Sequence, residues 1–154
     1  MYLETKRCII RKFDIEDVSE LYLTLSDAEV MKYIEPPFDM EKTSSFIEKY
    51  GICENPLVYA AMLRETGVVI GHVIYHPYDK TSYEIGWVLG RDYWGLGIAD
   101  EITKALIEHS KGKADSCVIE CDERQDISKH IAIKNGFEYE SREEGIITYR
   151  LKLQ

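Results

Sequence analysis

Residues Gly95, Leu96 and Gly97 form a short glycine-rich turn that could bind an anion. The turn leads into a stretch, Gly97–Ser110, with the apolar spacing of an amphipathic helix. Glycine lets backbone N–H groups approach a phosphate closely, and the positive end of the helix dipole favours the negative charge. A plain structural turn explains these glycines equally well. A dinucleotide-binding loop is disfavoured, because Asp100 occupies the place of its third glycine.

Glu84 is the candidate general base. In the alternating pattern Ser82–Leu89, Glu84 shares one strand face with Gly86 and Val88. A carboxylate among apolar neighbours is costly unless it is paired or functional. Burial would raise its pKa toward the range that is useful for a general base near neutral pH. A glutamate that simply reaches solvent from the end of a strand is the alternative, and both interpretations stay open.

A mixed α and β framework must position these groups. The sequence predicts about seven strands, at Arg7–Phe13, Leu57–Arg64, Val68–His76, Ser82–Leu89, Ser116–Cys121, Phe137–Ser141 and Ile146–Leu153. Helices are expected after an Asp14 N-cap, and over Glu41–Tyr50, Gly97–Ser110 and Ile127–Asn135. We therefore expect an α/β fold with a mostly antiparallel sheet, in which the Gly97–Ser110 crossover helix joins one parallel strand pair.

Aromatic residues in the predicted loops are candidates to line a pocket for a substrate. Consecutive prolines make the segment from Tyr33 to Phe38 a loop. Tyr33, Phe38 and Tyr93 would lie near the expected cleft, and His76 and Tyr78 are further candidates.

Composition narrows the class of protein. The chain has 154 residues, 45% of them hydrophobic, and a formal net charge of −9, which fits one domain over residues 1–154. The sequence has no basic stripe of the kind that predicts nucleic-acid binding. It also has no apolar run long enough to predict a membrane span. The start of the sequence lacks a signal-peptide pattern, so we expect a cytoplasmic protein. The four cysteines are predicted to be reduced and to bind no metal.

Two motifs resemble the GNAT N-acetyltransferases, in their RimJ- and RimL-like branch. The first is Gly86-Trp87-Val88-Leu89 followed by Trp94-Gly95-Leu96-Gly97-Ile98-Ala99, in which Trp94 replaces the family's usual Gln or Arg. The second is the segment from Ser128 to Asn135 that ends in Gly136-Phe137. The resemblance covers nearly the whole chain. It implies that acetyl-CoA inserts where two central parallel strands splay apart.

The resemblance also assigns expected roles to residues. Backbone groups of Trp87, Val88 and Leu89 would hold the pantetheine arm like an added strand. Backbone N–H groups of the turn and first helical residues would bind the pyrophosphate; these residues are Gly95, Leu96, Gly97, Ile98, Ala99 and Asp100. Gln125 stands where relatives often have an asparagine and is also expected at the cofactor.

The group that assists the leaving thiolate departs from the usual pattern. Many relatives use a tyrosine whose position here is Ala132, whereas the RimL-like branch has a serine that matches Ser128. Ser128 is therefore the candidate acid. An N-cap role for Ser128 in its predicted helix is an equally good interpretation.

The sequence thus predicts an acetyl-CoA-dependent N-acetyltransferase that acts without a metal. The acceptor would be an amine, either a protein N-terminus or a small molecule, that attacks the thioester directly in a ternary complex. A non-catalytic acyl-CoA sensor and a nucleotide-phosphate binder are the rival hypotheses. We expect a monomer or homodimer.

Overall fold

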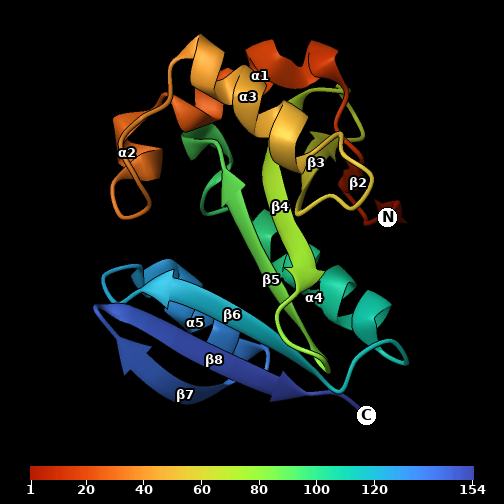
Figure 1. Ribbon diagram of the computed structural model, residues 1–154, viewed down its shortest axis with the longest axis vertical. Coiled ribbons are helices and arrows are strands. Elements are labelled where there is room, and N and C mark those ends of the chain that lie inside the picture. Colours follow the sequence, from red (N-terminus) through yellow and green to blue (C-terminus); the bar gives the residue numbers. More distant parts are fainter.

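One open sheet of eight strands runs through the chain, in the order β1-β2-β3-β4-β5-β6-β8-β7 (Figure 1). The computed structural model describes all 154 residues. The strands are β1 (Leu3–Glu4), β2 (Cys8–Arg11), β3 (Val58–Leu63), β4 (Val69–Pro77), β5 (Ser82–Leu89), β6 (Ser116–Asp122), β7 (Glu138–Glu143) and β8 (Ile146–Lys152). The helices are η1 (Ile15–Asp17), α1 (Val18–Leu25), α2 (Ala28–Met31), α3 (Met40–Tyr50), η2 (Arg91–Tyr93), α4 (Ile98–Ser110) and α5 (Asp126–Lys134).

The predicted sheet is confirmed: every neighbouring pair is antiparallel except β5 and β6. The structure adds an eighth strand, β1, which pairs with β2 over only two residues. It also adds the one-turn helix α2. Both elements are too short to leave a periodic pattern in the sequence. The Asp14 cap is as predicted, because Asp14 and Asp17 form a capping box around η1.

Helices cover the two faces of the sheet separately. Helices α1, α2 and α3 pack on one face through a core that includes Leu21, Val30 and Ile47. Helices α4 and α5 pack on the other face, where Ile102 and Ala132 belong to a larger core (Figure 1). Phe38 is 5% exposed within the first of these cores, so its predicted place in a substrate pocket is wrong. Its ring packs instead against Phe46 and Lys42 of α3.

The parallel pair is short, and this is what shapes the molecule. Strands β5 and β6 pair at three positions only: Ser82 with Ser116, Tyr83 with Cys117, and Glu84 with Val118. Beyond these positions β5 continues to Leu89 alongside β4, and β6 continues to Asp122 alongside β8. The two strands diverge in Figure 1. We call the diverging part of the pair the β5/β6 fork.

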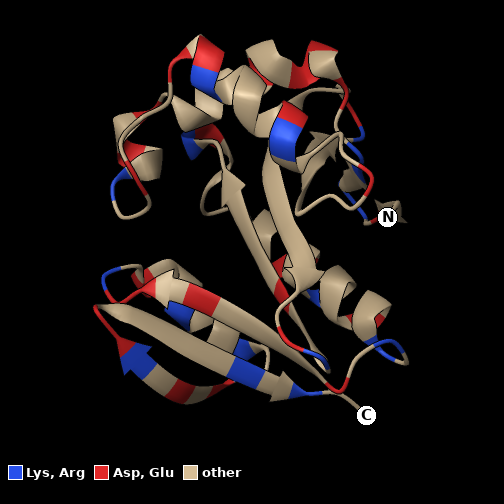
Figure 2. Cartoon of the chain, in the orientation of Figure 1, with Lys and Arg blue, Asp and Glu red and all other residues tan.

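Charged residues and cysteines are spread over the whole chain. Basic and acidic residues are interspersed over the helices and strands (Figure 2). All four cysteines are free, and three of them, Cys8, Cys117 and Cys121, are buried. No helix combines the length and apolar character that crossing a membrane requires.

Gly71 of β4 gives the clearest stability prediction. A Cβ atom there would lie 2.0 Å from the carbonyl oxygen of Val88 on β5, and backbone cannot yield as a flexible side chain can. We expect Gly71→Ala to lower the free energy of unfolding by about 3 kcal/mol in urea denaturation. Gly67→Ala is the control, because nothing lies within 4 Å of its added Cβ and only its positive φ opposes the change. Gly67→Ala should lower the free energy of unfolding by about 1 kcal/mol. Equal losses for the two variants would contradict the argument.

Candidate functional site

The glycine turn presents a row of free backbone donors. Gly95 and Gly97 have φ of 72° and 81°, left-handed values that favour glycine, and Gly97 immediately precedes α4. None of the N–H groups from residue 95 to residue 100 donates to an acceptor within the chain. Alternating backbone of this kind turns successive N–H groups toward one concave surface. The turn therefore fits an anionic group such as a pyrophosphate, at the positive end of the α4 dipole.

An ion pair from the other end of the sequence holds this turn in place. The Arg7 guanidinium donates through Nη1 to the carbonyl of Leu96 at 2.8 Å and through Nε to Glu101 Oε1 at 2.9 Å. Glu101 also accepts from the Arg7 backbone N–H at 2.8 Å and from the Thr5 hydroxyl at 2.6 Å. Partial burial opposes the charge on Glu101, but these donors outweigh it and lower the pKa of the carboxyl group. We call the ion pair of Arg7 with Glu101 the Arg7–Glu101 brace. It joins the segment before β2 to the first turn of α4.

A second tie connects α4 to α5. The Asp100 carboxylate accepts from Lys104 at 2.6 Å, Lys134 at 3.2 Å and Asn135 at 2.8 Å. Burial opposes ionisation, yet these three donors lower the pKa of Asp100 to about 2. The negative side chain is therefore neutralised by nearby lysines, and the Asp100 backbone N–H remains free for an anion.

The unpaired edge of β5 comes shortly before the glycine turn in the sequence. Trp87, Val88 and Leu89 belong to the part of β5 that has lost its β6 partner. The Trp94 indole N–H donates to the Leu89 carbonyl at 2.9 Å, which closes the connection between β5 and the glycine turn. Trp94 and Leu96 are nevertheless half exposed, at 47% and 54%. These side chains add apolar surface next to the free donors, as a ligand with both apolar and anionic parts would require.

Glu84 is the last β5 residue that pairs with β6, so it lies at the apex of the fork. Its side chain is 20% exposed, and its Oε1 is 3.9 Å from Nε2 of His76 on β4. Burial raises the pKa of Glu84, the nearby carboxylate of Glu120 raises it further, and His76 acts in the opposite direction. The Glu120 carboxylate accepts from the Tyr78 hydroxyl at 2.8 Å. Glu84 is thus a largely buried carboxyl group with no Lys or Arg partner.

Ser128 lies in the first turn of α5, but it does not cap that helix. The residue before the helix is Gln125, and no side chain caps the N-terminus. The N-cap interpretation of Ser128 is therefore wrong, since the helix begins at Asp126, one residue earlier than predicted. The Gln125 amide oxygen accepts from the Asp122 N–H at 2.9 Å and fixes the turn between β6 and α5. Ala132 is fully buried in the core.

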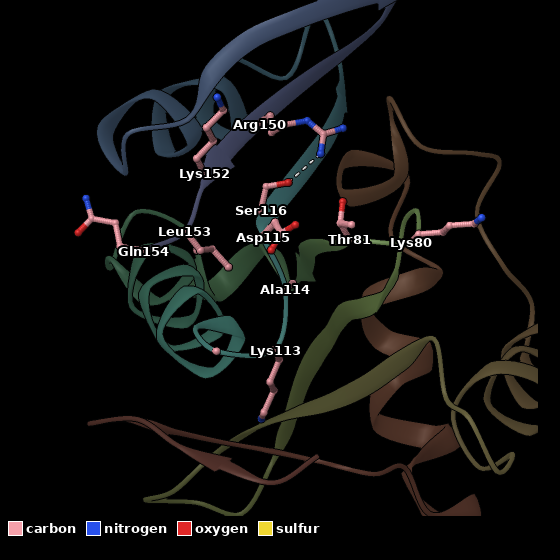
Figure 3. Close-up of a pocket in the computed structure, with 11 residues that line it drawn as sticks. Lys80, Thr81, Lys113, Ala114, Asp115, Ser116, Arg150, Lys152, Leu153 and Gln154 are labelled. Atoms are coloured by element: carbon pink, nitrogen blue, oxygen red, sulfur yellow. Dashed lines mark hydrogen bonds between the residues drawn. The ribbon is translucent and has the colours of Figure 1, made fainter.

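Two surface hollows lie outside this arrangement. The first hollow has a volume of about 470 Å³ and is lined by Tyr33, by residues of α2 and by residues at the ends of β6 and β8. The Arg124 side chain also lines it, with its Cζ 4.5 Å from the centre of the Tyr33 ring. Another, of about 790 Å³, is lined by none of the predicted site residues. Three lysines line it, Lys80, Lys113 and Lys152, but their side chains point away from one another (Figure 3). They do not converge on an anion. No group of three or more His, Cys, Asp or Glu side chains is placed to hold a metal ion.

Comparison with known protein families decides which family the chain belongs to. The family model described as an acetyltransferase (GNAT) domain matches residues 7–138. The chain belongs to the GNAT acetyltransferase family. The match includes the fork, the glycine turn and all of α5, so the family resemblance in the two sequence motifs is confirmed.

Individual relatives agree with this membership. An uncharacterized N-acetyltransferase, YnaD of Bacillus subtilis, is 36% identical over 111 residues, which are 71% of this chain and 65% of that relative. A GNAT-family acetyltransferase structure from Bacillus anthracis has a TM-score of 0.90 at 26% identity and covers 99% of this chain and 98% of that one. RimL, a ribosomal L7/L12 α-N-protein acetyltransferase solved with coenzyme A, has a TM-score of 0.79 at 18% identity, with 99% and 98% coverage. At that identity, the likeness to RimL shows the fold alone.

Sequence reasoning missed the residues that brace the site. The sequence places Arg7 only at the start of a predicted strand, and it gives no reason to select Glu101 or Glu120. Arg7 and Glu101 are 94 residues apart in the chain, so no local pattern joins them. The only available signal was an acidic residue in the first turn of a helix, which is ordinary at a helix N-terminus.

The brace yields a binding prediction. Glu101→Ala removes the acceptor for Thr5 and Arg7 and should leave the glycine turn less ordered before it binds a ligand. Since ordering then opposes binding, we expect acetyl-CoA affinity to fall about tenfold in isothermal titration calorimetry, equivalent to about 1.4 kcal/mol. Glu108→Ala, at an exposed position of the same helix, is the matched control. An affinity within about twofold of the unmodified protein would show that the turn keeps its shape without Glu101.

Proposed function

We propose that this chain transfers the acetyl group of acetyl-CoA to an amine, by direct attack within a ternary complex. The acceptor is a protein N-terminus or a small-molecule amine. One observation carries the proposal: a largely buried carboxyl group, Glu84, lies at the apex of a strand fork whose open end is followed by a turn with free N–H donors. Membership of the GNAT family supports it.

The chain's backbone supplies the binding groups in this proposal. The edge of β5 at Trp87, Val88 and Leu89 lacks a strand partner and would pair with the amide groups of the pantetheine arm. The N–H groups from Gly95 through Asp100, including those of Leu96, Gly97, Ile98 and Ala99, would bind the pyrophosphate. Gln125 uses its amide oxygen on Asp122, which leaves its amide nitrogen free to donate to the cofactor.

Glu84 and Ser128 would manage the proton and the leaving group. Acetyl-CoA supplies an activated acetyl thioester, and the amine nitrogen attacks its carbonyl carbon as the carbon–sulfur bond breaks. Glu84 takes the proton that the ammonium group must lose, directly or through water. Backbone N–H groups near Val88 polarise the carbonyl. The Ser128 hydroxyl, which has no hydrogen-bond partner in the chain, would donate to the departing thiolate. Positioning supplies much of the remaining acceleration.

A non-catalytic acyl-CoA sensor is the second candidate. Ala132 has only a methyl side chain, and it is buried in the core. This position therefore offers no hydroxyl group to a leaving thiolate. A thiol-release assay over a panel of amines separates the two functions. Turnover with any amine supports the enzyme, whereas a melting-temperature rise with acetyl-CoA and no turnover supports the sensor.

Glu84→Gln tests the general base. The change keeps the size of the side chain but removes its basic oxygen. We expect kcat/KM for the acceptor to fall by about 10²–10⁴-fold. In the unmodified enzyme kcat/KM should rise with pH as Glu84 ionises, at a pH above the usual glutamate range because burial raises its pKa. In the variant the rise that comes from ionisation of Glu84 should be absent. The rise that comes from deprotonation of the amine itself should remain, so the deficit should shrink at high pH, where free amine is abundant.

Acetyl-CoA affinity, measured separately, should barely change in the Glu84 variant. Glu138→Gln, at an exposed position of β7, is the matched control. A loss below about threefold at every pH would exclude Glu84 as the base.

Ser128→Ala tests the leaving-group role. Because Ser128 does not cap α5, its removal should leave the melting temperature within about 1 °C of the unmodified value. We expect kcat to fall about tenfold or more with little change in acetyl-CoA affinity, since the hydroxyl would act only as negative charge develops on sulfur. Ser45→Ala, at an exposed position in α3, is the control. Unchanged turnover in the Ser128 variant would remove this serine from the mechanism.

A further inference from the structure

Arg150 of β8 bridges two buried hydroxyl groups at the closed end of the fork. Its Nη1 donates to Ser82 Oγ at 2.6 Å and to Ser116 Oγ at 2.7 Å, and the two serine oxygens are 2.7 Å apart. Figure 3 shows the Arg150 guanidinium turned toward Ser116. The serines are 1% and 5% exposed, so water does not compete for these hydrogen bonds. We call these three residues the Arg150 bridge.

The bridge lies where the parallel pair has little else to hold it. Ser82 on β5 and Ser116 on β6 form the first of only three paired positions between these strands. Arg150 reaches them from β8, which pairs with β6 along its whole length. The bridge therefore ties three strands together directly below the point where two of them separate.

The charge of Arg150 is neutralised on its outer side, which keeps the guanidinium in one orientation. Its Nε donates to Glu140 Oε1 of β7 at 2.7 Å, and its Nη2 is 3.6 Å from Asp79 in the β4–β5 connection. A planar guanidinium can serve a carboxylate on one edge and two hydroxyls on another, whereas an ammonium group cannot span the same set of partners. The geometry thus requires an arginine.

Glu84 follows Ser82 by two residues and lies on the same face of β5. The position of Glu84 at the apex therefore depends on where β5 and β6 separate. We propose that Arg150 is a positioning residue for acetyl transfer: by bridging Ser82 and Ser116 it fixes the apex of the fork and thereby the carboxylate of Glu84. This inference rests on the proposed function. It concerns the chemical step and leaves the glycine turn, which binds the cofactor, unaffected.

The test compares variants that remove the bridge in two different ways. The double change Ser82→Ala with Ser116→Ala removes both hydroxyls and keeps the ion pairs of Arg150, while Arg150→Lys keeps a positive charge and loses the bridge. For both we expect kcat per folded molecule to fall about tenfold or more, with acetyl-CoA affinity within about twofold. Arg142→Lys, which alters a β7 arginine paired with Glu123, is the matched control and should keep full turnover.

A second readout needs no turnover. Hydrogen exchange at the amides of residues 82–84 and 116–118, the paired positions of β5 and β6, should be faster in the double variant, because the pairing there is weakened. If the unmodified protein acetylates no amine, the proposed function fails, and the exchange rates alone decide whether the bridge fixes the apex. Turnover within twofold of the unmodified enzyme, or unchanged exchange at these amides, would overturn the inference.

Discussion

The structure depends on one constraint: the only parallel strand pair must part after three positions. A sheet edge inside a folded protein is costly, because its backbone N–H and C=O groups lose water without gaining partners. Here each strand of the fork is secured on its other side, β5 by β4 and β6 by β8. Helices on both faces fix the arms. The inner edge of β5 can then stay without a strand partner.

Charge is distributed to serve the two ends of the fork differently. At the open end, in a chain of net charge −9, the backbone N–H groups at the start of α4 are free of partners within the chain, and Lys104 and Lys134 neutralise the carboxylate of Asp100. At the closed end, Arg150 is satisfied within the chain. Backbone donors suit a phosphate because they cost no side-chain entropy when the ligand binds.

Between these ends, the environment of Glu84 is the chemically distinctive feature. Its partial burial and its acidic neighbour Glu120 both favour the neutral form of the carboxyl group. A fold shared by many enzymes does not by itself specify the acceptor, so the function has to be argued from these side chains.

The sequence by itself determined the local elements: the Asp14 capping box, the faces of β5, and the glycine turn before α4. Each depends on residues close in the chain, whose propensities and periodicity act locally. Tertiary structure alone decided that Phe38 is in the core, that α5 begins at Asp126, and which residues brace the site. The Arg7–Glu101 pair and the Arg150 bridge join segments 94 and up to 68 residues apart. Such contacts exist only after the sheet has assembled, because strand order sets which distant side chains meet.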